Sequence, residues 1–183
     1  MIKLAILDVD GTLTDGGYYV PSHTRIDTGV PNNFYLRKLN TKDSVGMKLI
    51  HDAGIRCIIV SGSREPCIQH INYLNPYITV ADNVQDKYDW VETFIKHSKG
   101  MYSWEEIAAI GDEINDAKLL ENVGMAACPS DAVPEIIDIV SNRKDGFVMN
   151  KPGGYGCVRE FIDLIRSMQK IPAKWVNWEK KYE

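Results

Sequence analysis

The fold of this chain is decided by one stretch near its start, Ile2-Lys3-Leu4-Ala5-Ile6-Leu7-Asp8-Val9-Asp10-Gly11-Thr12-Leu13-Thr14-Asp15-Gly16. An apolar run typical of a buried strand is followed at once by carboxylates, glycines and hydroxyls. Residues two apart share a face of a strand, so Asp8 and Asp10 can serve one site if the chain turns there. The pair could instead cap a helix or form an Asx turn. The flanking residues favour a site for a divalent cation and a phosphate, because Mg²⁺ binds carboxylates together with phosphate oxygens.

Composition favours a single globular domain. The chain has 183 residues, of which 44% are hydrophobic, and this fits one domain with a sizeable core. A net charge of -4 argues against nucleic acid or an anionic membrane as the main partner. No apolar stretch approaches the ~20 residues of a membrane span, and the first apolar run meets Asp8 too early for a signal peptide. We therefore expect a cytoplasmic protein whose partner is a small anionic metabolite.

Apolar runs alternate with capped, periodic segments along the chain. The expected strands are 2–7, 55–60, 78–80, 107–110, 125–127 and 139–140, and the expected helices are 43–53, 65–74, 87–97, 114–121, 133–138 and 158–168. This alternation predicts an α/β sandwich around a mainly parallel sheet. Between Asp15 and Asn40 the pattern breaks, and a small β-hairpin is expected there. The expected organisation is one domain over 1–168, with the hairpin inserted at about 16–40, and a C-terminal tail over 169–183.

Polar residues follow the carboxyl ends of several expected strands, where open parallel sheets bind their ligands. Ser61 and Gly62 follow the second strand and suit phosphate, although a simple helix cap explains them equally well. Asp112 follows the 107–110 strand and could complete a metal site with Asp8, or else cap a helix. Lys87 taken alone would be a solvated lysine. The repeated placement at strand ends is what indicates a site.

These residues resemble the phosphatases of the haloacid dehalogenase superfamily. The resemblance rests on D-x-D-G-T-L-T-D at Asp8–Asp15, on Ser61, on Lys87 and on G-D-E-x-x-D at Gly111–Asp116. It implies a Rossmann-like three-layer sandwich of the superfamily's kind, with a hairpin flap and no large cap domain.

The resemblance also implies a mechanism. Asp8 would attack phosphorus and form an aspartyl-phosphate, while Asp10 would protonate the leaving alcohol and later deprotonate water. Mg²⁺ would be held by Asp8, the backbone carbonyl of Asp10 and Asp112. The remaining implied residues are Ser61, Gly62 and Lys87 as phosphate ligands, and Glu113 and Asp116 as supporting residues.

A narrower resemblance is to the cap-less branch of 3-deoxy-D-manno-octulosonate 8-phosphate and nonulosonate 9-phosphate phosphatases. It rests on the hairpin, on Lys42–Lys48 and on Gly153–Glu160. Members of that branch are Mg²⁺-dependent tetramers whose active sites are completed by a neighbouring subunit, so a homotetramer with intersubunit active sites is expected. Arg64 and Arg159 are candidates for gripping a substrate carboxylate or phosphate, and exposed arginines at helix starts are the alternative.

The chain departs from the branch at several positions. Ser44 stands where the branch often has Gly, Ser61 where it has Thr, and Glu113 where it has Asp. An arginine expected beyond Arg64 is missing. These changes bear on the sugar-acid substrate more than on catalysis.

Together these observations predict a Mg²⁺-dependent phosphomonoesterase for a small phosphorylated sugar acid. A phosphatase for another metabolite, such as a sugar phosphate or nucleotide, is the alternative within enzymes. A phospho-accepting signalling module also has acids at strand ends and a lysine, but its acceptor Asp follows a later strand. A catalytically silent assembly subunit is disfavoured, because each motif position holds a competent residue.

Overall fold

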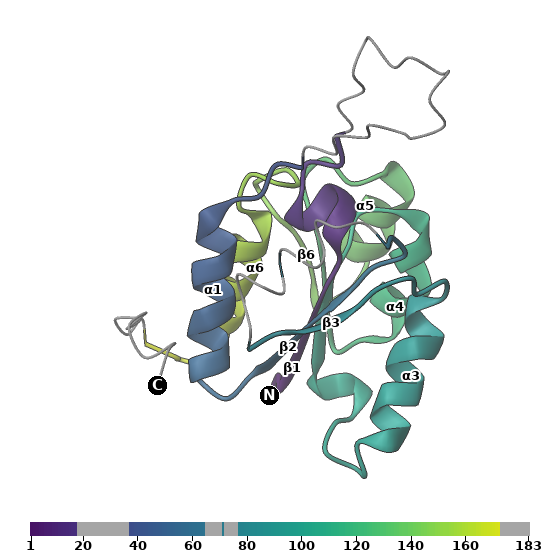
Figure 1. The fold of residues 1–183 in the computed structure, drawn as a ribbon, viewed down its shortest axis with the longest axis vertical. Coiled ribbons are helices and arrows are strands. Elements are labelled where there is room, and N and C mark those ends of the chain that lie inside the picture. Colours follow the sequence, from purple (N-terminus) through teal and green to yellow (C-terminus); the bar gives the residue numbers. More distant parts are fainter. Residues whose placement is uncertain (18–36, 65–70, 72–76, 173–183) are drawn as a thin grey trace, which may run out of the picture.

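The computed structural model describes residues 1–17, 37–64, 71 and 77–172. At its centre lies a six-stranded sheet in the order β3-β2-β1-β4-β5-β6, with every neighbouring pair parallel (Figure 1). The strands are β1 Leu4–Leu7, β2 Arg56–Val60, β3 Thr79–Ala81, β4 Ile107–Ile110, β5 Met125–Cys128 and β6 Gly146–Val148. The expected α/β sandwich with a parallel sheet is confirmed.

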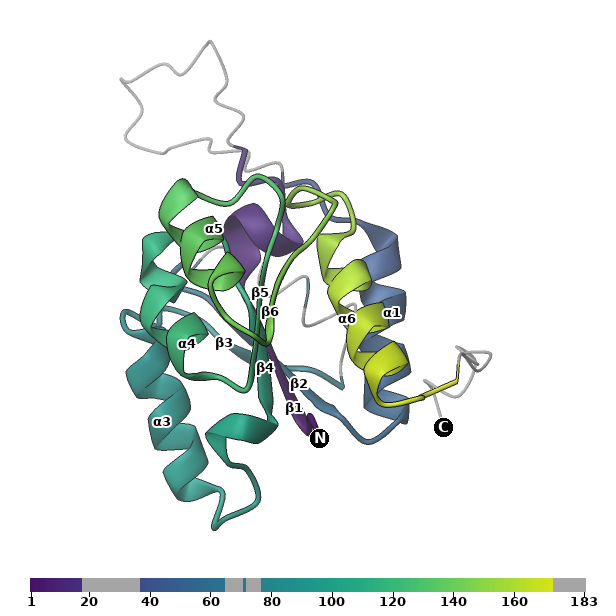
Figure 2. The ribbon, with the colours of Figure 1, turned by 180° about the vertical axis from the view of Figure 1, so that it is seen from behind.

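Helices cover both faces of this sheet (Figures 1 and 2). Helices α1 Thr41–Asp52 and α6 Cys157–Met168 lie on one face, and α3 Lys87–His97, α4 Ala117–Asn122 and α5 Pro134–Ser141 lie on the other. The alternation of side chains along β1 explains the layers: Ala5 and Leu7 pack in the core on the α1 side, and Leu4 and Ile6 in the core on the α3 side. Strands buried on both faces are uniformly apolar for this reason.

The register of the central strands sets where the chain leaves the sheet. Leu7 pairs with Ile59 of β2 and with Ile110 of β4. The backbone N–H of Asp8 also donates to the carbonyl of Ile110 over 3.1 Å. The residues that follow β1, β2 and β4 therefore emerge at the same edge, where their side chains can meet.

One expected strand was wrong. Ile139 and Val140 belong to α5, which runs on to Ser141 because Ile136 and Val140, four residues apart, bury one helical stripe against the sheet. The strand that pairs with β5 is instead Gly146–Val148. It escaped prediction because it is short and only partly buried at the edge of the sheet.

Several expectations fall on residues outside the described part of the chain. These are most of the hairpin, nearly all of the 65–74 helix and the tail from residue 173. Within the described part, an antiparallel bridge between Thr14 and Leu39 joins the two ends of the hairpin insertion. No helix of the described residues is long and apolar enough to cross a membrane.

Candidate active site

The turn after β1 brings the first carboxylates into place. Val9–Leu13 form a π-type turn in which Asp10 and Gly11 depart from helical backbone angles, and Gly11 adopts φ +84°. A Cβ on Gly11 would lie 2.0 Å from Oδ2 of Asp112, so only glycine fits both the backbone angle and the space. The hydroxyl of Thr12 donates to Asp112 over 2.8 Å. The turn is thereby joined to the end of β4.

Lys87 is a buried cation at the start of α3. Its side chain is 2% exposed, and its Nζ donates to Asp8 and, over 2.6 Å, to Asp116. Burial lowers the pKa of Lys87, but the carboxylates of Asp8 and Asp116 outweigh burial and raise it. Lys87 therefore stays protonated between two carboxylates. It is buried, unlike most lysines, whose ammonium groups are exposed to solvent.

The carboxylates around Lys87 form a cluster able to bind a cation. Oxygens of Asp8, Asp112 and Asp116 lie within 4.8 Å of one another. Burial, followed by the charge of Asp116, raises the pKa of Asp8 well above its usual value. Burial likewise raises the pKa of Asp112 to about 6, although the hydroxyl of Thr12 opposes this. Three carboxylates here surround the single ammonium of Lys87, so a further cation would balance their charge.

Within this cluster Asp116 has a different set of partners. One of its oxygens accepts from Lys87, and the other accepts from the backbone N–H of Glu113 over 3.3 Å. The side chain of Glu113 bonds to the backbone N–H of Ile114 over 2.7 Å and begins the next turn. Asp116 is close enough to bind a cation, but both of its oxygens already accept hydrogen bonds, from Lys87 and from the backbone of the turn. Asp8 and Asp112 are therefore the better candidate ligands.

The segment after β2 lies beside the turn. Ser61 is 1% exposed and accepts a bond from the backbone N–H of Ser63 over 3.1 Å, so its own O–H is free to donate elsewhere. Ser63 donates its hydroxyl to Oδ2 of Asp10 over 2.9 Å. Gly62 and Arg64 are exposed. Ser61 and Gly62 thus stand at the same sheet edge as Asp8.

Arg37 contacts the site and was missed by the sequence reasoning. Its Nη2 lies 3.1 Å from Oδ1 of Asp10, and its side chain is 3% exposed. No motif marks this residue. The one available signal was a basic pair, Arg37 and Lys38, placed within the apolar and aromatic residues of Phe34–Leu39 in the expected second arm of the hairpin.

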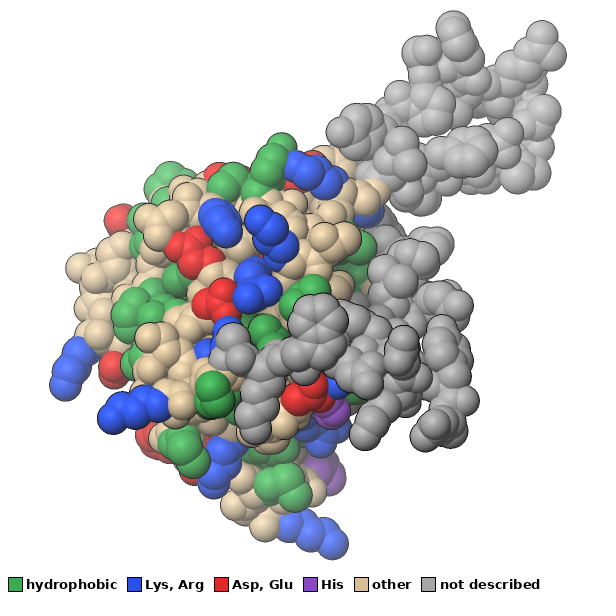
Figure 3. All heavy atoms as spheres, turned by 90° about the vertical axis from the view of Figure 1, so that its left-hand side faces the viewer, with side chains coloured by type: hydrophobic (Ala, Val, Ile, Leu, Met, Phe, Trp, Pro, Cys, Tyr) green, Lys and Arg blue, Asp and Glu red, His purple; other side chains and the backbone are tan. Residues whose placement is uncertain are grey.

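Arg159 lies in the first turn of α6, on the side that faces α1. Its backbone N–H donates to Asp43 over 2.6 Å, and its Nε donates to Asp163 over 2.7 Å, one helical turn further from the sheet edge that carries Asp8. Figure 3 views the molecule from the α1 side, and basic and acidic side chains alternate on the face that it shows. Asp163 also pairs with Arg166 over 2.5 Å. In this arrangement the guanidinium of Arg159 is directed along the helix.

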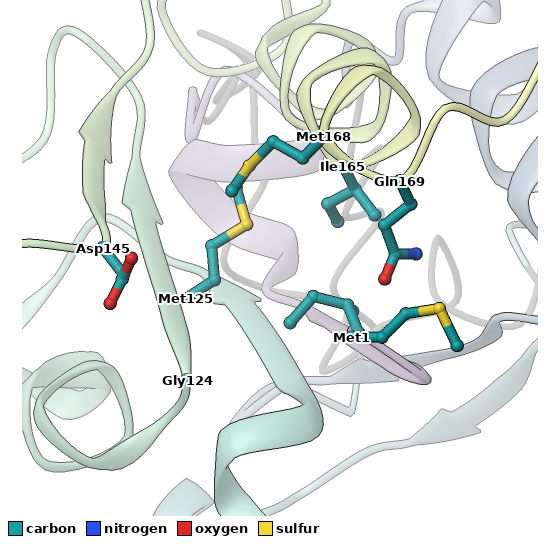
Figure 4. Close-up of a pocket in the computed structure, with 8 residues that line it drawn as sticks. Met1, Gly124, Met125, Asp145, Ile165, Met168 and Gln169 are labelled. Atoms are coloured by element: carbon teal, nitrogen blue, oxygen red, sulfur yellow. The ribbon is translucent and has the colours of Figure 1, made fainter.

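A separate cavity of about 400 Å³ lies at the opposite edge of the sheet, where the strands begin. Met1, Met125 and Asp145 line it from the starts of β1, β5 and β6, and Met168 and Gln169 line it from the end of α6 (Figure 4). It is mostly apolar and contains none of the carboxylates described above.

Comparison with known proteins finds hydrolases and phosphatases that are similar to this chain. A family model for haloacid dehalogenase-like hydrolases matches residues 63–145. The 3-deoxy-D-manno-octulosonate 8-phosphate phosphatase KdsC of Salmonella typhi is 28% identical over 168 residues, which cover 90% of this chain and 79% of that protein. The crystal structure of the phosphatase of the same name from Yersinia pestis superposes with a TM-score of 0.77 at 26% identity, covering 92% of this chain and 83% of that one.

A larger relative contains a region similar to the whole chain. N-acylneuraminate cytidylyltransferase B of Danio rerio is 23% identical over 98% of this chain, and the chain spans 39% of its length. The match therefore concerns one part of that protein. Together with the carboxylates and serine after β1, β2 and β4, and with Lys87 at the start of α3, these comparisons show that the chain is similar to haloacid dehalogenase-like hydrolases, and they support a phosphatase of phosphoric monoesters.

Proposed function

We propose that the chain is a Mg²⁺-dependent phosphomonoesterase that acts on a small phosphorylated sugar acid through an aspartyl-phosphate on Asp8. The observation that carries the proposal is the buried Asp8–Lys87–Asp116 arrangement beside the more exposed Asp10. It combines a shielded carboxylate, a fixed cation and a second carboxylate that a substrate can reach. These are the requirements of phosphoryl transfer to an acid side chain.

The donor set fits a divalent metal ion. Asp8, Asp112 and the backbone carbonyl of Asp10 would hold it, since hard cations prefer oxygen ligands. The geometry supports this, because oxygens of Asp8, Asp112 and Asp116 lie within 4.8 Å of one another and Lys87 is the cation that pairs with two of them. When bound, the ion supplies the charge that allows an anionic nucleophile to approach an anionic phosphate.

The first half of the reaction uses both carboxylates of the turn. An oxygen of Asp8 forms a bond to phosphorus, and the bond between phosphorus and the substrate's bridging oxygen breaks with its electron pair going to that oxygen. Asp10 gives the departing alcohol a proton. The N–H of Gly62, the hydroxyl of Ser61 and the ammonium of Lys87 bind the phosphoryl oxygens, and Asp116 keeps Lys87 in place.

The second half returns the enzyme to its starting state. Asp10, now ionised, takes a proton from water while the water oxygen attacks phosphorus. The bond from phosphorus to Asp8 breaks, and inorganic phosphate leaves. The exposed fractions agree with this division of work: the side chain of Asp10 is 31% exposed, and that of Asp8 is 8% exposed.

The substrate class is supported by relatives. Proteins named as 3-deoxy-D-manno-octulosonate 8-phosphate phosphatases are 28% identical to this chain. One structural neighbour with that name, from Moraxella catarrhalis, was solved with magnesium, phosphate and KDO, at a TM-score of 0.79 and 22% identity. Arg64 and Arg159 remain the proposed contacts for the substrate's anionic groups. A homotetramer with shared active sites remains a prediction. Light scattering on the purified protein measures the mass of the assembly and so tests the number of subunits.

Phosphate release from a panel of sugar-acid, sugar and nucleotide phosphates tests the proposal. We expect release with Mg²⁺ and none with EDTA, highest on a sugar-acid phosphate, and lost in Asp8→Asn. Highest release on a sugar phosphate or nucleotide would keep the chemistry and replace the substrate class. Stable phosphorylation of the protein without release of phosphate would favour a signalling module. The absence of both phosphorylation and phosphate release would favour a silent subunit.

A further inference from the structure

The carboxylate of Asp10 is held on both of its oxygens. Oδ1 is buried and forms an ion pair with Nη2 of Arg37 at 3.1 Å without a hydrogen bond, and Oδ2 accepts a hydrogen bond from the hydroxyl of Ser63 at 2.9 Å. The two partners come from different parts of the chain, Arg37 from the segment before α1 and Ser63 from the segment after β2. They differ in kind as well. A serine hydroxyl turns freely about one bond, whereas a guanidinium is a rigid planar fork that keeps its charge at every working pH.

The segment that carries Arg37 is itself anchored to the catalytic turn. Leu39 forms the antiparallel bridge with Thr14, and the side chain of Asn40 accepts from the backbone N–H of Lys42 over 3.0 Å to begin α1. Because the bridge joins this segment to the turn that carries Asp10, the guanidinium approaches the carboxylate from a fixed direction. The side chain of Arg37 is 3% exposed, so the surrounding protein limits its rotamers.

An ion pair of this kind could serve stability alone. A buried arginine needs a counter-charge, and a carboxylate supplies it wherever it lies. Here, however, the counter-charge is the one carboxylate of the turn whose side chain stays 31% exposed, and one of its oxygens has only a hydroxyl that a substrate can displace. One oxygen of this carboxylate is therefore buried against a fixed cation, and the other has a hydroxyl partner that a substrate can replace.

We propose that Arg37 is a positioning residue of the phosphatase, holding Asp10 through Oδ1 so that Oδ2 faces the leaving oxygen. The inference rests on the proposed role of Asp10 as acid and base. A proton donor must lie within hydrogen-bond reach of its acceptor, and free aspartate side chains populate several staggered rotamers. Arg37 removes this freedom. Ser63 holds Oδ2 until the substrate arrives and then yields it.

The role of Arg37 is tested by the leaving group of the substrate. An alkyl phosphate needs a proton on its departing oxygen, whereas 2,4-dinitrophenyl phosphate leaves without one. Arg37→Ala should lower kcat/KM, which reports the steps up to departure of the leaving group and not the later hydrolysis, by roughly 10- to 100-fold on the alkyl phosphate, a part of the ~10²–10⁴-fold that general acid catalysis supplies. It should lower kcat/KM much less on the dinitrophenyl ester. Arg37→Lys, which keeps a cation of shorter reach, should recover part of the alkyl activity.

The matched control is Lys38→Ala, which removes the neighbouring exposed lysine that lies over the ring of Tyr155. It should leave both substrates unchanged. Equal losses on the two substrates in Arg37→Ala and Arg37→Lys would overturn the inference and leave a purely structural ion pair, as would no loss in either variant.

Asp10→Asn, run in parallel, separates the inference from the function beneath it. If Asp10→Asn loses activity on the alkyl phosphate but much less on the dinitrophenyl ester, Asp10 is the acid. The Arg37 variants then test only the positioning role of Arg37. If Asp10→Asn is fully active on the alkyl phosphate, the proposed function of Asp10 fails, and the inference fails with it.

Discussion

Replacing Lys87 by Met should remove a large part of the folding stability of this protein. Lys87 is 2% exposed between Asp8 and Asp116, which are also buried. Methionine fills a similar volume but leaves two carboxylates facing each other without a cation. Breaking a buried ion pair in this way typically costs about 3–5 kcal/mol, against a total stability of about 5–15 kcal/mol for a domain.

Urea unfolding followed by circular dichroism, in EDTA at pH 7, measures this loss. Lys118→Met is the matched control, because Lys118 pairs with Asp86 and Asp89 on the exposed surface, where a pair contributes only about 0–1 kcal/mol. A loss in Lys87→Met no greater than that in Lys118→Met would refute the reasoning. It would mean that Asp8 and Asp116 do not depend on Lys87 for their charge.

Two further changes act at neighbouring points of the same sheet edge. Burial raises the pKa of Asp43 from 3.8 to about 6, so the stability that this residue contributes is complete below pH 3.8 and is lost as the pH rises through about 6. Asp43→Asn should therefore gain up to about 3 kcal/mol relative to the wild type between pH 4 and pH 7.5 in urea unfolding, and a pH-independent difference would contradict this. Gly11→Ala should abolish activity and weaken Mg²⁺ binding, since its Cβ would lie 2.0 Å from Oδ2 of Asp112. Gly100→Ala is its control, with a φ of +81° and nothing within 4 Å of the added Cβ, and a Mg²⁺ titration that does not separate the two variants would count against the proposed metal site.

Much of the fold follows from local patterns in the sequence. The buried strands β1, β2, β4 and β5 are short, continuous apolar runs, and such runs are expected where helices cover both faces of a parallel sheet. Prediction failed at the sheet edge. There β6 is partly exposed and carries a weak signal, and an apolar helical stripe over Ile136 and Val140 was divided into a helix and a strand.

The candidate site divides in a similar way. Residues that closely follow a strand, such as Asp8, Ser61 and Asp112, could be predicted from the sequence to lie near one another, because parallel strands end at a common edge. Arg37 could not, since it lies beyond the hairpin insertion and its approach to Asp10 depends on the bridge between Thr14 and Leu39. A contact between two residues far apart in the sequence that do not both follow strands of the sheet carries no local signal.

The central claim is that Asp8 carries the phosphoryl group during turnover. Rapid quenching of a reaction in progress, reduction with borohydride and peptide mass spectrometry locate an aspartyl-phosphate, because reduction converts the modified residue to homoserine. The account predicts homoserine at position 8 in the wild type. With 2,4-dinitrophenyl phosphate, whose leaving group needs no proton from Asp10, it predicts larger amounts in Asp10→Asn, where the water is no longer activated. Steady turnover with no modification at position 8, or with modification at another carboxylate, would contradict it.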